Sequence, residues 1–303
     1  MSLYAWFATR GADGERLVRP SNPRSRMDLL TYWNLKERPF EATWDTRFFY
    51  QSPAHDEALN RLCFLVAERT MNLGLLTGEI GGGKTLTRAV FTERLDPHQF
   101  QVVTRENSGF TFKELLGAIL PGLDALPAAP RQGKLALYER LQTVVERLHR
   151  EDRHLILVFD EAQEMSPATL NELKLLTNLN GQGQSRLTIL LLGQPELRAK
   201  IAALPAINQR ISLRFHLQAL SPSETGAYVR HRLKVAGHPQ GDLFPDDTIA
   251  QLFQATQGIP RQINRIAKLA LEFAWLHEKP RVAPGAVDAV AQDLQRQQEL
   301  PIP

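Results

Sequence analysis

One stretch of the sequence, LGLLTGEIGGGKTLT over residues 73–87, constrains the fold more than any other. It reads as a buried strand that runs into a glycine-rich loop and then into a helix. Its residues Gly78, Gly83, Lys84 and Thr85 fit the pattern G-x-x-x-x-G-K-[ST], which is typical of a phosphate-binding loop when a strand precedes it and a helix follows. The alternative interpretation is an ordinary glycine turn between a strand and a helix.

The chemistry of phosphate binding requires these residue types. Glycines at 81–83 carry no Cβ, so the backbone can wrap an anion with its N–H groups pointing inward. The helix that begins near Lys84 adds its partial positive charge. The Lys84 ammonium can reach the β- and γ-phosphates, and the Thr85 hydroxyl can ligate Mg²⁺. We therefore predict ATP and Mg²⁺ as cofactors. The predicted cofactor-binding residues of the loop are Gly78, Glu79, Ile80, Gly81, Gly82, Gly83, Lys84, Thr85 and Leu86.

Composition sets broad limits. A chain of 303 residues with 43% hydrophobic residues can bury a sizeable core, and its length suggests about two domains. The net charge of +3 is only a weak hint of an anionic partner, since a nucleotide would account for part of it. The single cysteine, Cys63, cannot form an internal disulfide and is expected to be a buried thiol. No apolar stretch approaches the roughly 18 residues of a membrane helix, so we expect no membrane span and a cytoplasmic protein.

The residues before the loop contain three segments of different character. Residues 1–26 mix Gly, Ser, Pro and Arg without periodicity, which predicts a disordered leader, and Met27 is a candidate for the natural start. Residues 32–50 are rich in aromatics, and we interpret them as a clasp folded onto the core, with contact to the adenine as the alternative. Residues 53–69 are predicted to form a helix with Ser52 as its N-cap.

The middle of the chain alternates apolar runs with amphipathic segments. This alternation predicts an α/β fold with a parallel sheet sandwiched by helices, and the phosphate loop makes it a P-loop NTPase sheet. Residues 166–179 are predicted to form a helix with Leu170, Leu173, Leu176 and Leu179 inward, closed by Gly181 and Gly183. The other expected elements are strands at 100–105, 155–159, 187–192 and 211–217, the last an outer strand, helices at 84–96, 111–120 and 134–150, and a linker at 121–130.

Polar residues follow two of the buried strands. Asp160 and Glu161 come directly after the apolar run LILVF, and Gln194 follows the strand over 187–192. Ligands collect at the carboxyl ends of parallel strands, so we expect these residues at the same edge of the sheet as the loop. Asp160 would hold Mg²⁺ and Glu161 would polarise the attacking water. Gln194 would bond the γ-phosphate or that water, with a plain turn residue as the alternative.

The composition changes at Leu220, after which only helices are predicted. Ser221-Pro222-Ser223-Glu224 forms a capping box with proline at the first helical position. We therefore predict a P-loop ATPase domain over 27–219 and a small all-helical lid domain over 220–303. The expected helices of the second domain are 222–236, 246–257, 261–278 and 284–297.

Taken together, the chain resembles the AAA+ P-loop ATPases. It is more closely similar to the ExeA or general secretion pathway protein A type, which is related to transposition-regulator ATPases. The resemblance covers about residues 29–297. The segments that carry it are YWNLKERPFEATWDTRFFY, TGEIGGGKT, VFDEAQ, LLLGQPEL, INQRISLRFHL and QGIPRQINR.

The resemblance implies roles for individual residues. Residues 78–85 resemble the Walker A loop and Asp160-Glu161 the Walker B pair. Gln194 corresponds to the sensor 1 position and Arg261 to the sensor 2 arginine of the lid. Arg210 looks like the arginine finger that enters a neighbouring subunit, with Arg214 as the alternative. Without the resemblance, Arg210 reads as a solvated loop arginine.

The resemblance also implies a function. We expect an AAA+ ATPase that hydrolyses ATP as a homo-oligomer to drive assembly or remodelling of a partner complex, with secretion or pilus assembly proteins as partners. The alternative is a DNA-loading ATPase that regulates a transposase and binds duplex DNA. The ExeA type commonly carries a membrane helix and a cell-wall-binding domain after the lid, and this sequence ends at Pro303. We therefore expect it to resemble the soluble relatives and not to bind the cell wall directly.

Overall fold

The computed structural model describes residues 28–69, 71–106, 109–123, 133–181 and 184–299. The expected leader over 1–26, the candidate start Met27, most of the linker over 121–130 and the closing Gly183 therefore lie outside the described residues.

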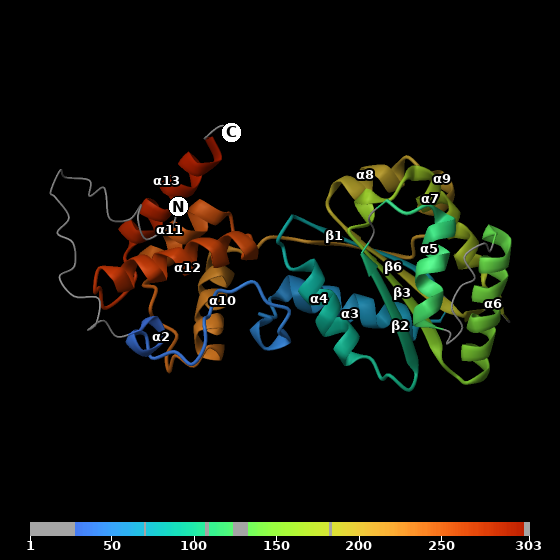
Figure 1. The fold of residues 1–303 in the computed structure, drawn as a ribbon, viewed down its shortest axis with the longest axis horizontal. Helices are drawn as coiled ribbons and strands as arrows, with labels where there is room; N and C mark the ends of the chain where they lie inside the picture. The colour runs from blue at the N-terminus through green and yellow to red at the C-terminus, as the bar shows by residue number, and fades with distance from the viewer. Residues whose placement is uncertain (1–27, 70, 107–108, 124–132, 182–183, 300–303) are drawn as a thin grey trace.

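A parallel sheet forms the centre of the larger lobe (Figure 1). Its strand order is β2-β3-β6-β1-β7, so β1 lies between β6 and β7, and β7 is an edge strand as predicted. In register, Leu75 of β1 pairs with Leu191 of β6 on one side and Arg214 of β7 on the other. The strands are β1 (Leu73–Gly78), β2 (Phe100–Glu106), β3 (His154–Asp160), β6 (Leu187–Gly193) and β7 (Leu213–Leu217).

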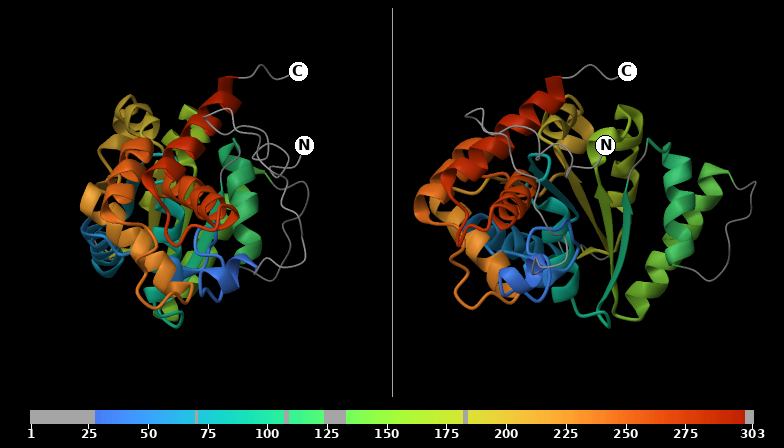
Figure 2. Two further views of the ribbon diagram at one scale, coloured as in Figure 1. Left: turned by 90° about the vertical axis from the view of Figure 1, so that its left-hand side faces the viewer. Right: turned by 60° about the vertical axis from the view of Figure 1, so that its left-hand side comes forward.

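Helices cover both faces of this sheet, which confirms the predicted α/β sandwich (Figures 1 and 2). One face packs against α3 (Pro53–Ala67) and α4 (Lys84–Arg94). Ser52 caps α3, and Cys63 lies half-buried at the border of the apolar face of α3, less buried than expected. The helices on the opposite face are α5 (Phe112–Ile119), η2 (Leu120–Gly122), α6 (Lys134–Arg150), η3 (Ala162–Glu164), α7 (Pro167–Glu172), η4 (Leu173–Asn178), α8 (Glu196–Ala202) and α9 (Pro205–Asn208).

The predicted helix over 166–179 is wrong in type. The chain forms one short α-helix, α7, and then continues as the 3₁₀ helix η4. All four predicted leucines are nevertheless buried, with Leu179 at the end of η4. A 3₁₀ helix has three residues per turn, so a strict spacing of three keeps one face inward, whereas an α-helix would rotate that face away. Gly181 belongs to a short hairpin, β4 (Asn180–Gly181) with β5 (Gln184–Ser185).

A helical bundle makes up the smaller lobe. Its first helix begins at the predicted capping box, in which the Ser221 side chain and the Glu224 side chain each bind the other's backbone N–H. Gly258, which has φ of +72°, contacts Leu220 at the start of this lobe. The Leu220 N–H donates a hydrogen bond to the Gly258 carbonyl over 3.0 Å. The helices of the bundle are α10 (Pro222–Val235), α11 (Asp246–Thr256), α12 (Pro260–Leu276) and α13 (Pro284–Glu299).

Most of the aromatic segment that precedes α3 packs against this bundle, and Phe49 packs against the core between α3, α4 and the sheet. Its short helices α2 (Leu29–Tyr32) and η1 (Thr46–Phe48) contribute to the apolar core of the bundle. The buried Arg232 guanidinium of α10 donates to the Pro39 carbonyl over 2.6 Å and to the Glu41 carbonyl over 2.9 Å. Consequently the segment is anchored to the bundle, and the chain passes between the lobes both before α3 and after β7.

The helices of the described part of the chain include no segment that is both long and apolar enough for a bilayer.

Candidate nucleotide site

The phosphate loop connects the end of β1 to the start of α4. Its turn depends on glycine, since Gly81 and Gly83 have φ of +78° and +97°. Lys84 is 5% exposed, and its ammonium donates to the Gly78 carbonyl over 2.8 Å and to the Glu79 carbonyl over 3.0 Å. Burial lowers the pKa of Lys84, although Glu161, Asp160 and Glu79 oppose this shift.

Close packing explains two of the loop glycines. A Cβ on Gly83 would lie 2.9 Å from Nε2 of His55, and a Cβ on Gly81 would lie 2.4 Å from Cβ of Arg261. His55 is buried beneath the loop, and its Nδ1 lies 2.7 Å from the Ser52 hydroxyl. Its pKa is lowered to about 4 by burial. The loop is therefore supported from below by α3 and touched from the other side by the helical bundle.

The carboxylate of Asp160 lies at the end of β3 and is 1% exposed. Burial raises the pKa of Asp160, while Arg88, a backbone hydrogen bond from Glu161 and a hydrogen bond with the Thr85 side chain lower it. Arg88 Nε lies 3.4 Å from Oδ2 of Asp160. The structure thus brings Asp160 and Thr85, the two predicted Mg²⁺ ligands, into contact.

Glu161 follows in a left-handed backbone conformation, with φ of +51°. Its Oε2 accepts a hydrogen bond from Nε2 of Gln163 over 2.6 Å and a longer one from Nε2 of Gln194 over 3.4 Å. The Gln194 backbone N–H donates to Oε1 of Gln163 over 3.0 Å. Because β6 lies between β3 and β1, Gln194 is positioned between the carboxylates and the phosphate loop.

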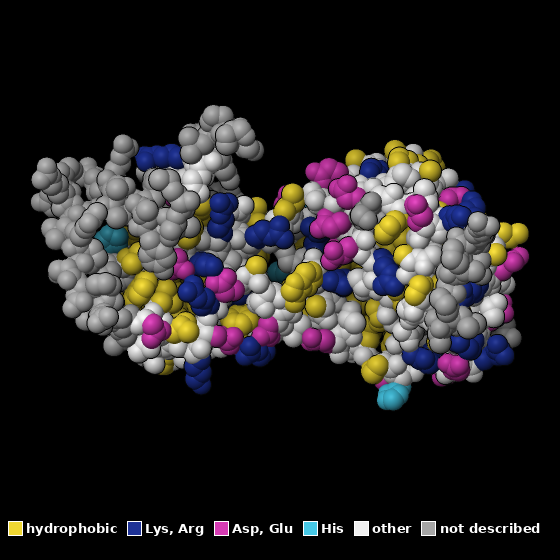
Figure 3. Space-filling view, in the orientation of Figure 1, with side chains coloured by type: hydrophobic (Ala, Val, Ile, Leu, Met, Phe, Trp, Pro, Cys, Tyr) yellow, Lys and Arg dark blue, Asp and Glu magenta, His cyan; other side chains and the backbone are white. Residues whose placement is uncertain are grey.

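Arg261 reaches the loop from the second residue of α12. Its backbone N–H donates to the Gly81 carbonyl over 3.2 Å, and its positive charge contributes to the lowered pKa of Lys84. The sequence indicated Arg261 only through the family resemblance, and the structure places it against the loop. Lys and Arg side chains also lie along the narrow region between the lobes (Figure 3).

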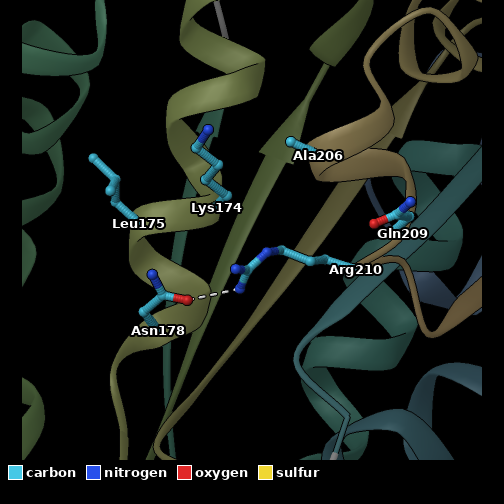
Figure 4. A pocket seen from close by; sticks show the side chains of 6 residues that line it. All are labelled: Lys174, Leu175, Asn178, Ala206, Gln209 and Arg210. Carbon is cyan, nitrogen blue, oxygen red and sulfur yellow. Dashed lines mark hydrogen bonds between the residues drawn. The ribbon is translucent and has the colours of Figure 1, made fainter.

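Arg210 lies elsewhere. It immediately precedes β7, at the amino end of the sheet, whereas the loop follows the carboxyl end of β1. Its Nη1 donates to Oγ1 of Thr177 and to Oδ1 of Asn178, each over 2.7 Å, beside a pocket that Lys174 also lines (Figure 4). The alternative, Arg214, donates to the carbonyl and side chain of Asn208. Neither set of contacts joins the phosphate loop of the same chain, so any role there needs a second subunit.

The residues present suit Mg²⁺ and a nucleotide. Mg²⁺ is usually held by one or two carboxylates together with substrate phosphates and water, so Asp160 with the Thr85 hydroxyl is a fitting donor set. Among the described residues there is no group of three or more His, Cys, Asp or Glu side chains that could hold a metal by themselves.

Three side chains near the site were not assigned a role from the sequence. Arg88 was detectable, because it lies four residues after Lys84 and therefore on the same face of the helix. Gln163 belongs to the segment VFDEAQ but is separated from Gln194 by 31 positions, and only the adjacent strands bring them together. His55 gave no local signal, since its contact with the loop is a tertiary one.

Comparison with known proteins agrees with this geometry. Residues 67–201 match the family model of an AAA domain. A general secretion pathway protein A from Aeromonas hydrophila is 33% identical over 266 residues, which cover 87% of this chain and 48% of that protein. The chain therefore spans about half the length of that curated relative.

Two solved structures have similar folds. Cdc6p from Pyrobaculum aerophilum aligns with a TM-score of 0.63 and 19% identity over 82% of this chain and 70% of that one. The ORC2 protein of Aeropyrum pernix, described as its ADPNP-ADP complexes, aligns with a TM-score of 0.63 and 15% identity over 85% and 71%. At these identities the likeness concerns the fold.

Proposed function

The chain carries an AAA domain in an AAA+ P-loop fold, and from this premise we propose that it binds ATP with Mg²⁺ and hydrolyses it to ADP and phosphate. The observation that carries the proposal is the convergence of three strand ends. The loop with Lys84 follows β1, Asp160 and Glu161 lie at the end of β3, and Gln194 follows β6, the strand between β1 and β3. Convergence of a cation, two carboxylates and an amide at a glycine loop is what phosphoryl transfer to water requires.

Each residue has a separate part in this scheme. The Lys84 ammonium, which now donates to loop carbonyls, turns to the β- and γ-phosphates. Asp160 and Thr85 would hold Mg²⁺, which when bound would supply positive charge against the phosphate oxygens. Glu161 accepts the proton of the attacking water, and Gln194 orients that water or the γ-phosphate. Arg261 adds positive charge from the lid.

The biological role we propose is assembly or remodelling of a partner complex by a homo-oligomer. Similarity to a general secretion pathway protein A supports partners in secretion or pilus assembly. In this scheme Arg210 acts as a finger in the site of a neighbouring subunit, which its position before β7, at the amino end of the sheet, supports. Regulation of a transposase on duplex DNA is the alternative that the same assays address.

The test is the Lys84→Ala variant. We expect it to lose at least about tenfold in ATP affinity, since a charge-assisted contact to phosphate is removed, while circular dichroism reports an unchanged fold. Lys113→Ala, at an exposed position of α5, is the matched control. Wild-type ATP affinity in folded Lys84→Ala protein would refute the assignment.

The same preparations separate the two biological roles. We expect ATPase rates that do not change with duplex DNA at near-physiological salt, because the net charge is only +3. Tight, cooperative binding of duplex DNA in the presence of a non-hydrolysable ATP analogue would instead favour the DNA-loading alternative.

A further inference from the structure

Gln163 makes the shortest contact to the carboxylate of Glu161. Its Nε2 donates to Oε2 of Glu161 over 2.6 Å, a short distance for an N–H···O hydrogen bond, and the acceptor is a carboxylate. Its Oε1 accepts the backbone N–H of Gln194 over 3.0 Å. One carboxamide therefore joins the side chain after β3 to the backbone after β6, and it uses a different atom for each contact.

The backbone around Glu161 is held in place without Gln163, but the carboxylate is not. Glu161 has φ of +51°, a conformation that a residue with a Cβ adopts at a cost and keeps only when its surroundings hold it there. Its N–H donates to Oδ1 of Asp160 over 3.0 Å, which fixes the backbone but not the carboxylate. Gln163 supplies the missing restraint on the side chain.

The neighbouring strand is shaped to admit Gln163. A Cβ on Gly193, the last residue of β6, would lie 2.7 Å from Oε1 of Gln163, so a larger residue there would displace the carboxamide. Because Gly193 has no side chain, the side chain of Gln163 can lie against the end of β6. This strand lies between Glu161 and the phosphate loop.

A lysine holds the segment that carries Gln163. Nζ of Lys200, on α8, donates to the carbonyl of Gln163 and to the carbonyl of Met165 over 3.1 Å. These contacts close the short helix η3 onto α8. The position of the Gln163 carboxamide therefore depends on α8 as well as on β6.

We propose that Gln163 is a positioning residue that aims the Glu161 carboxylate at the site of water attack, and that Lys200 keeps Gln163 in place. The inference rests on the proposed ATPase function and adds to it a residue that acts through Glu161. Without the contact, the carboxylate would sample several rotamers, and a misplacement of about 1 Å can cost about a hundredfold in rate.

The test uses Gln163→Glu, which is isosteric and separates the two contacts. A carboxylate at this position still accepts the hydrogen bond from the Gln194 N–H. It cannot donate a hydrogen bond to Glu161, and its negative charge repels the Glu161 carboxylate. We expect kcat to fall about a hundredfold, with unchanged ATP affinity and with circular dichroism reporting a folded protein. Glu164→Ala, at the exposed neighbouring position, is the matched control and should keep the wild-type kcat.

A second measurement does not depend on activity. In the Glu161→Gln, Gln163→Glu double variant the donor and acceptor are exchanged, so the amide at 161 can donate to the carboxylate at 163. We expect a double-mutant cycle of unfolding free energies to report favourable coupling between the two positions. Lys200→Met should lower kcat in the same sense as Gln163→Glu, and it serves as the test if Gln163→Glu does not fold.

The outcomes are distinguishable. Wild-type kcat in folded Gln163→Glu, or zero coupling in the cycle, would overturn the role of Gln163 while the ATPase proposal stands. Wild-type turnover by Glu161→Gln would instead overturn the part of the proposed function on which this inference rests.

Discussion

Two buried histidines predict a loss of stability in mild acid. His55 lies beneath the phosphate loop and is 4% exposed, and His154 lies at the start of β3 and is 2% exposed. Burial lowers the pKa of each from 6.5 to about 4, and the positive charges of Arg69 and His149 add to the shift of His154. Both imidazoles are therefore neutral in the folded protein at pH values where the unfolded chain would protonate them.

The sign and size follow from proton linkage. Each folded-state pKa lies below its unfolded value, so the stabilising contribution is complete above pH 6.5 and is lost as the pH falls toward 4. When the pH falls from about 7.5 to about 5, each histidine should lower the free energy of unfolding by about 2 kcal/mol, an order-of-magnitude figure from the linkage relation. Together they should remove about 4 kcal/mol.

The assay is urea unfolding at several pH values between about 5 and 7.5. We expect His154→Gln to remove about half of the pH dependence, because glutamine can still bond the Thr188 hydroxyl, 2.9 Å from Nε2 of His154, but does not titrate. His98→Gln, at an exposed position, should leave the dependence unchanged. An equally steep pH dependence in the His154→Gln and His55→Gln variants would refute the argument.

Three further predictions concern the ATPase cycle. Glu161→Gln should bind ATP as the wild type does but hydrolyse it far more slowly, since an amide cannot accept the proton; single-turnover kinetics would show this. Asp160→Asn should raise the Mg²⁺ concentration needed for half-maximal activity in a titration, because one carboxylate ligand is lost. Arg210→Ala subunits should be inactive alone and regain activity when mixed with Glu161→Gln subunits, which supply the missing arginine; no recovery at any mixing ratio would count against a finger acting between subunits.

Local patterns determined most of the individual elements. The continuous apolar run after His154 became a buried strand that ends at Asp160, and the capping residues Ser52 and Ser221 begin the helices they were predicted to begin. Such signals are visible in sequence because their causes lie within a few residues. The predicted helix over 166–179 was wrong in type for a related reason: its leucines recur every three residues, a spacing that suits a 3₁₀ helix better than the α-helix for which it was taken.

The site was predictable where each residue is tied to an element boundary. Lys84 follows a glycine loop, and Asp160 and Gln194 come at the ends of buried strands. Because ligands bind at the carboxyl ends of parallel strands, the sequence predicted that these residues lie at one edge of the sheet. Arg261 needed the family resemblance, because nothing in its own sequence shows that α12 begins against Gly81.

The sequence by itself determined the succession of strands and helices along the chain, the phosphate loop, and the residue types available to hold ATP and Mg²⁺. The tertiary structure decided which side chains act on one another. The strand order sets β6 beside β3, and this brings Gln194 within reach of both Gln163 and Glu161. It also folds α3 under the loop, so that His55 lies against Gly83. Contacts of this kind join residues tens of positions apart, and their distances depend on how whole elements pack, which no local pattern encodes.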